Sequence, residues 1–114
     1  MTYDTAITAL ADPRRRAIFE TLRRQPRTVR EIADTQPVSR PAVSQHLKVL
    51  QGAGLVTVRP EGTRRYYGVR REGLADLRAW IDGFWDDVLE SFAKEVENRE
   101  VEKRGSRQTE ESPP

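Results

Sequence analysis

The chain has 114 residues, 36% of them hydrophobic and 33% charged, so its length fits one domain with a thin core. It has no cysteine and a single histidine, which excludes disulfides, thiolate metal sites and a histidine-rich zinc site within one chain. No apolar run is long enough for a signal peptide or approaches the ~18 residues of a membrane span, so we expect a cytoplasmic protein without a membrane partner.

The small net charge of +2 hides a strong asymmetry along the chain. Residues 1–71 hold 14 Arg and Lys against 6 Asp and Glu, whereas residues 72–114 hold 6 against 12. The local charges are therefore +8 and −6. A polyanion would be drawn to the first part and repelled from the second, although charge blocks of this kind can also be plain solvated faces.

Four helices are predicted in the first half of the chain. Apolar residues at helical spacing indicate a short helix over residues 4–11, and Asp12-Pro13 then supplies an N-cap and a first helical residue for a helix through Arg24. Thr28 and Glu31 form a capping box for a third helix, and Ser39 caps a longer helix over residues 40–53. Two helices joined by a short turn around Pro37 predict a helix-turn-helix.

The second half begins with a predicted hairpin. Gly54 is suited to a left-handed C-cap, and two β-rich runs, 55–59 and 65–69, flank a glycine-containing loop over residues 60–64. A long helix follows over residues 72–98. We therefore expect a mainly α fold, a winged helix-turn-helix of about five helices and a two-stranded wing. One domain over residues 1–100 would precede a disordered charged tail over 101–114.

The helix over residues 40–53 carries the strongest functional signal. Val43, Leu47 and Leu50 form one apolar stripe that should face the core. The outward face comprises Arg40, Pro41, Ser44, Gln45 and Lys48, and it offers a guanidinium, a carboxamide and a hydroxyl. Arginine can bind guanine O6 and N7, and glutamine can bind adenine N6 and N7, so this face suits the DNA major groove. In isolation it could equally be an ordinary polar helix face.

The predicted hairpin strengthens the interpretation as a DNA-binding element. Five arginines and one acidic residue, Glu61, lie between residues 59 and 71. Thr63, Arg64 and Arg65 are at the predicted tip, where a wing would reach phosphates or the minor groove.

The run VSRPAVSQHLKVLQGAGLV over residues 38–56 resembles the signature of the ArsR family of repressors. The segments ALADPRRR, residues 9–16, and GTRRYY, residues 62–67, are similar to that family as well. The resemblance implies a dimer that occupies an operator, often in its own promoter, and blocks transcription. The family's recognition contacts carry over onto Arg40, Pro41, Ser44 and Gln45, and its wing contacts onto Thr63, Arg64 and Arg65.

The family's metal sites do not carry over. Residues 28–34 contain no cysteine, and the carboxylates of Asp82, Asp86, Asp87 and Glu90 are not accompanied by a histidine. We therefore expect no metal and no cofactor. The segment GFWDD, residues 83–87, resembles the metal-independent branch of the family.

The C-terminal helix carries an apolar stripe wider than a small winged domain needs for itself. Together with the first helix it resembles the family's dimer surface, which would comprise Ile7, Leu10, Trp80, Phe84, Trp85 and Val88. Packing within one chain is the alternative.

These patterns predict a sequence-specific transcriptional regulator that binds double-stranded DNA, and the family resemblance implies a dimeric repressor of an inverted-repeat operator. A small molecule or a protein is a candidate effector, which the sequence does not identify. The alternative is a winged-helix module that binds proteins and no DNA. An enzyme is not expected, because no nucleophile–base pair, glycine-rich phosphate loop or metal cluster is evident.

Overall fold

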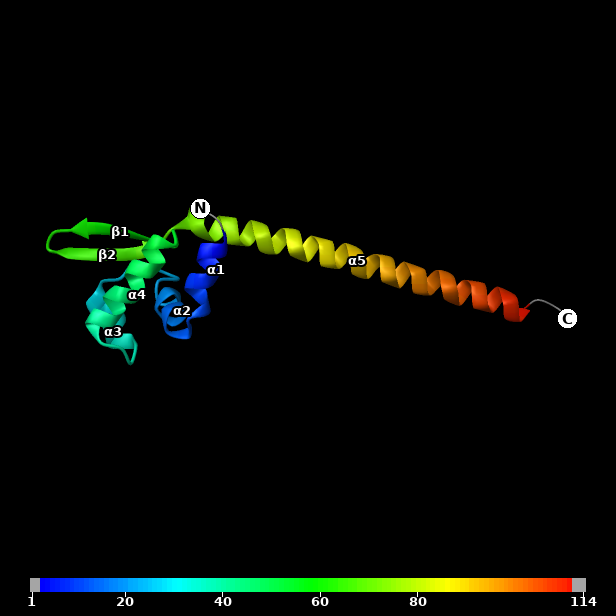
Figure 1. Ribbon diagram of the computed structural model, residues 1–114, viewed down its shortest axis with the longest axis horizontal. Coiled ribbons are helices and arrows are strands. Elements are labelled where there is room, and N and C mark those ends of the chain that lie inside the picture. Colours follow the sequence, from blue (N-terminus) through cyan, green and yellow to red (C-terminus); the bar gives the residue numbers. More distant parts are fainter. Residues whose placement is uncertain (1–2, 112–114) are drawn as a thin grey trace. The chain divides into compact units, whose positions relative to one another are not determined.

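The computed structural model describes the backbone of residues 3–111 and the side chains of residues 3–103. These residues form five helices and one two-stranded antiparallel sheet (Figure 1). The helices are α1 (Tyr3–Ala11), α2 (Pro13–Glu20), α3 (Val29–Thr35), α4 (Arg40–Gly52) and α5 (Arg71–Glu111), and the strands are β1 (Val56–Glu61) and β2 (Arg64–Val69). The predicted winged helix-turn-helix is confirmed.

The chain divides into two compact units, of which the first ends at Ala79 and the second begins at Trp80. Helix α5 continues to Glu111, beyond its predicted end and into the segment predicted to be disordered. The division into a domain over residues 1–100 and a disordered tail over 101–114 stays a prediction, and residues 112–114 lie outside the described residues. Among those described, no helix combines the length and apolar character that crossing a bilayer requires.

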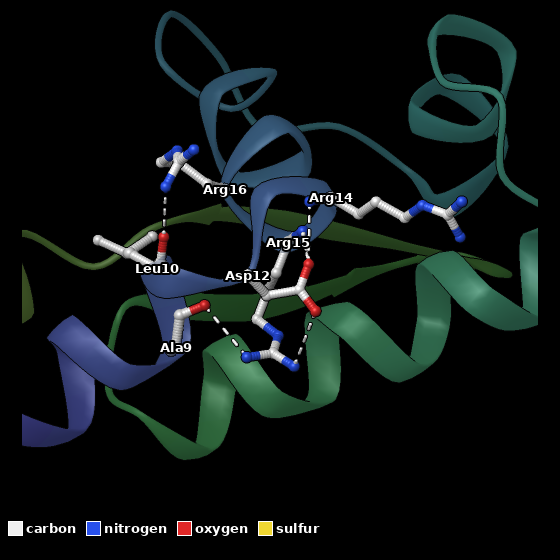
Figure 2. A network of polar contacts seen from close by, with 6 residues as sticks. All are labelled: Ala9, Leu10, Asp12, Arg14, Arg15 and Arg16. Atoms are coloured by element: carbon white, nitrogen blue, oxygen red, sulfur yellow. Dashed lines mark hydrogen bonds and ion pairs between the residues drawn. The ribbon is translucent and has the colours of Figure 1, made fainter.

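A network of side chains fixes the turn between α1 and α2 (Figure 2). The carboxylate of Asp12 caps α2 by accepting hydrogen bonds from two of its backbone N–H groups, as predicted. The guanidinium of Arg15 donates to the carbonyl of Ala9 at 3.1 Å, and that of Arg16 donates to the carbonyl of Leu10 at 3.0 Å. These bonds satisfy carbonyls at the end of α1 and tie the two helices together.

Helix α2 ends at Glu20 rather than at the predicted Arg24. The N–H of Leu22 donates to the carbonyl of Phe19 at 3.0 Å, and the N–H of Arg23 donates to the backbone carbonyl of Glu20 at 3.2 Å. These bonds span three residues instead of four, so the helix tightens and ends before the proline at position 26.

The core of the first unit is built around α4. This helix contacts α1, α2, α3 and β1, and its predicted apolar stripe, Val43, Leu47 and Leu50, is completely buried. The other buried side chains come from α1, α2 and α3, from the turn after α2, and from the segment that joins α4 to β1 and the first residue of β1. They are Ala6, Ala9, Ile18, Leu22, Ile32, Ala53, Leu55 and Val56. Because α4 is held on one side by this core, its opposite side is presented to solvent in a fixed orientation.

The hairpin is tighter than predicted. Strands β1 and β2 pair from Val56 with Val69 to Glu61 with Arg64, so the loop contains two residues, Gly62 and Thr63, instead of five. Gly62 has φ +64°, and no residue other than glycine has a positive φ in the described part of the chain. These signs match a type II′ turn, whose twist suits a two-residue hairpin.

Candidate nucleic-acid interface

Helix α4 starts in a way that exposes its first residues. Ser39 is the N-cap, and its hydroxyl accepts a hydrogen bond from the Ala42 N–H at 3.4 Å. The five side chains predicted to contact bases or phosphates are all exposed, and they are Arg40, Pro41, Ser44, Gln45 and Lys48. The side chains of Arg40, Gln45 and Lys48 make no hydrogen bond or ion pair within the described part of the chain, so their donors are available to a partner.

Helix α3 packs against α4 and begins with the predicted capping box. The Glu31 N–H donates to the Thr28 hydroxyl at 3.2 Å, and the Glu31 carboxylate accepts from the Thr28 N–H at 3.3 Å. Ile32 anchors the helix in the core. This arrangement confirms the two-helix motif and leaves Arg30 exposed on the surface of α3.

The wing presents the second group of predicted residues. Thr63, Arg64 and Arg65 are exposed at and next to the loop of the hairpin. Tyr67, two residues further along β2, packs against the core. The wing is therefore anchored at its base and open at its tip, as a phosphate-contacting element requires.

An additional strand-like pairing holds the wing and was missed by the sequence analysis. The Arg27 N–H donates to the Tyr67 carbonyl at 2.9 Å, and the Tyr67 N–H donates to the Arg27 carbonyl at 2.8 Å. The guanidinium of Arg27 also donates to the carbonyl of Thr21 at 2.8 Å. The segment between α2 and α3 thus pairs with the wing, but a one-residue bridge leaves no periodic pattern that could have predicted it.

An open hollow of about 620 Å³ lies where α3, α4 and the wing meet. It brings three of the predicted residues together, Ser44 from α4 and Arg64 and Arg65 from β2. Arg30 lines the same hollow, although no sequence pattern had singled it out. The predicted face of α4 and the wing therefore both contribute to this hollow, whereas Arg40, Pro41, Gln45 and Lys48 do not line it.

The residues predicted to form a dimer surface are distributed over both units. In the first unit, Ile7 is exposed, whereas Leu10 is half-buried against the core. In the second unit, an exposed apolar face runs along α5 and comprises Trp80, Ile81, Phe84, Trp85, Val88, Leu89, Phe92 and Val96. Phe84 is 61% exposed and Trp85 57% exposed, which is unusual for large aromatic side chains in one protein chain. The described residues contain no group of three or more His, Cys, Asp or Glu side chains placed to hold a metal ion.

Comparison with known proteins places this geometry in context. Residues 10–59, which include α2, α3 and α4, match a family described as a helix-turn-helix domain. The chain is 53% identical over 95 residues to the HTH-type transcriptional regulator Rv2034 of Mycobacterium tuberculosis. That match covers 83% of this chain and 89% of the relative.

Solved structures agree with the sequence matches. An ArsR family transcriptional regulator, RHA00566, superposes on this chain with a TM-score of 0.66 at 29% sequence identity. The matched region covers 73% of this chain and 91% of RHA00566. The homodimeric winged helix-turn-helix DNA-binding domain of Mb0332 from Mycobacterium bovis, described as a possible ArsR-family regulator, has a TM-score of 0.60 at 34% identity. The matched region covers 74% of this chain and 78% of the Mycobacterium bovis chain.

Proposed function

This chain belongs to the ArsR family of winged helix-turn-helix transcriptional regulators, and from that premise we propose that it is a homodimeric repressor of an inverted-repeat operator. The observation that carries the proposal is the two-sided character of α4. One side is completely buried, and the other exposes a guanidinium, a hydroxyl and a carboxamide beside an arginine-bearing wing.

The proposed reading of DNA divides these side chains into two groups. Arg40 and Gln45 lie on the first turns of α4, where a recognition helix contacts base edges in the major groove. Each bidentate contact of such side chains with a base gives about 1–3 kcal/mol of discrimination. Arg64 and Arg65 of the wing contact the sugar-phosphate backbone, which fixes the position of the protein without reading sequence.

The apolar face of α5 supports a dimer. Eight large apolar side chains are exposed along one helix, and a contiguous exposed apolar face is typical of a surface that another protein covers. A second copy of the same chain covers this face, as the homodimeric Mycobacterium bovis relative suggests. Two-fold symmetry then presents two recognition helices to half-sites ~34 Å apart on one face of DNA.

Repression follows from occlusion in this proposal. A dimer seated over an inverted repeat within a promoter excludes RNA polymerase from the same DNA. The chain's own promoter is the first candidate operator, in line with the family resemblance of the recognition helix.

Selection from a random DNA library tests the proposal directly. Purified protein should retain fragments that share an inverted repeat, and the same repeat should occur in the protein's own promoter. Adding the protein to a transcription reaction on that promoter should reduce transcript yield. Retention of no DNA at about 0.1 M salt would instead favour a protein-binding winged helix. Increased transcript yield would contradict repression while leaving operator binding intact.

A further inference from the structure

The hollow between α3, α4 and the wing combines side chains from three separate segments. Arg30 comes from α3, Ser44 from α4, and Arg64 and Arg65 from β2. All belong to the first compact unit, so their relative placement is part of one body. Arg30 is not among the residues to which the family resemblance assigns a DNA contact.

The charge around the hollow favours an anion. Three guanidinium groups line it, and none of them makes an ion pair within the described residues. The one carboxylate present belongs to Glu31, and it accepts hydrogen bonds from the Thr28 N–H at 3.3 Å and the Thr28 hydroxyl at 3.1 Å. The three guanidinium charges outnumber this one carboxylate, so the arginines dominate the field that an approaching ligand meets.

We propose that this hollow binds a phosphate of the DNA backbone and that Arg30 and the two wing arginines contact this phosphate jointly. The inference rests on the proposed function, because it takes α4 as the element that docks on DNA. Ser44 belongs both to the exposed face of α4 and to the rim of the hollow. When α4 occupies a groove of the DNA, the DNA strand that borders this groove therefore passes the hollow. A phosphodiester of that strand then meets donors from α3 on one side and from the wing on the other.

This contact sets the position of the recognition helix. Phosphate contacts carry no sequence information, but they fix register and orientation on the duplex. Arg30 would anchor α3 to the same DNA strand that the wing contacts. The position of α4 on the DNA would then be fixed by both α3 and the wing. Arg30 is accordingly a positioning residue of the DNA complex rather than a base-reading one.

The salt dependence of DNA binding tests this assignment. Arg30→Ala should lower the slope of log affinity against log salt by about one, equally on operator and on random DNA. Between about 50 and 200 mM salt, the wild-type protein should therefore lose about 3.5-fold more affinity than the variant. Arg30→Lys should keep the slope, because the charge is retained. Arg24→Ala is the matched control, since it removes an exposed charge of the same unit outside the hollow.

A second measurement locates the phosphate. Operators with one neutral methylphosphonate at a time should reveal one backbone position per half-site at which wild-type binding weakens and Arg30→Ala binding does not. Inorganic phosphate, exchanged for chloride at constant ionic strength, should not compete with DNA. Selective competition would assign the hollow to a free phosphate ion and overturn the proposal.

Other outcomes separate the two proposals. If the wild-type protein binds its operator but Arg30→Ala behaves as Arg24→Ala does, the phosphate assignment fails and the proposed function stands. A change in sequence preference on Arg30→Ala, without a change in salt slope, would likewise refute the assignment. If the wild-type protein retains no DNA, both proposals fail together.

Discussion

Gly73, in the first turn of α5, lies directly against the backbone carbonyl of Gly54. A Cβ atom at position 73 would overlap the oxygen of that carbonyl. Gly54 itself has φ +75°, which glycine adopts without strain, and its carbonyl also accepts a hydrogen bond from the Arg70 guanidinium at 3.5 Å. The Arg70 N–H donates to the Leu55 carbonyl at 2.8 Å. The start of α5 is thus held against the turn that follows α4.

This close contact predicts that Gly73→Ala destabilises the protein. The new methyl group overlaps backbone, which cannot move aside as a flexible side chain would, so a cost of about 1–3 kcal/mol in the free energy of unfolding is expected. Gly52→Ala is the control, because a Cβ there meets nothing within 4 Å. That change should be neutral or stabilise α4 by about 0.5–1 kcal/mol. Urea denaturation measures both, and equal effects would contradict the close contact.

Base reading by α4 predicts a loss of specificity on Gln45→Ala. The affinity for the operator should fall by about 1–3 kcal/mol while the affinity for random DNA stays unchanged, because a carboxamide contacts a base edge and carries no charge. Competition binding with operator and random duplexes measures the specificity ratio, which is the affinity for the operator divided by the affinity for random DNA.

The control for this change lies on the same helix. Gln51 is also exposed but belongs to the last turn of α4, away from the N-terminal end that would enter the groove. Gln51→Ala should leave the specificity ratio unchanged. If both variants reduced it equally, α4 would not be reading bases from its first turns.

The apolar face of α5 predicts that Phe84→Glu weakens the dimer. Burying an aromatic side chain of this kind contributes about 1.5–3 kcal/mol, and two-fold symmetry removes it from both protomers. The dissociation constant of the dimer should therefore rise at least about 100-fold. Sedimentation velocity across a concentration series measures the shift to monomer.

Asn98→Glu provides the matched control for this prediction. It adds the same negative charge to α5 at an exposed polar residue. Its dimer dissociation constant should change little in comparison. A wild-type protein that is already monomeric at high concentration would refute the role of the apolar face.

Asp12 predicts a specific dependence of stability on pH. The hydrogen bond from the Arg15 N–H, assisted by that from the Arg14 N–H, holds the pKa of Asp12 below its ordinary value of 3.8. Because the folded-state pKa is lowered, the charged cap stabilises the fold fully above pH 3.8, and this contribution is lost as the pH falls through the lowered pKa.

Asp12→Asn isolates this effect, since asparagine can still cap α2 but does not titrate. The difference in unfolding free energy between the wild-type protein and this variant should be constant at neutral pH and should shrink below pH 3.8. Denaturation at a series of pH values measures it. A difference that stayed constant down to the lowest pH would show that the charge of Asp12 contributes nothing.

The elements that could be predicted correctly from the sequence are those whose defining residues lie close together in the chain. The capping box of Thr28 and Glu31 involves residues three apart, and the buried stripe of α4 recurs every three or four residues. The hairpin was predicted from its two β-rich runs, but its loop was overestimated. Pro60 and Arg65 pair across the strands, and proline in a strand ordinarily argues against that assignment.

Helix starts, helix caps and the exposed polar face of α4 can be predicted from the sequence alone, because caps and periodicity act within a few residues. Three contacts become apparent only in the folded chain: Arg27 pairs with Tyr67, Gly73 meets Gly54, and Arg30 shares a hollow with the wing. Each of these contacts joins segments far apart in the chain, and it forms only after the common core has set their positions.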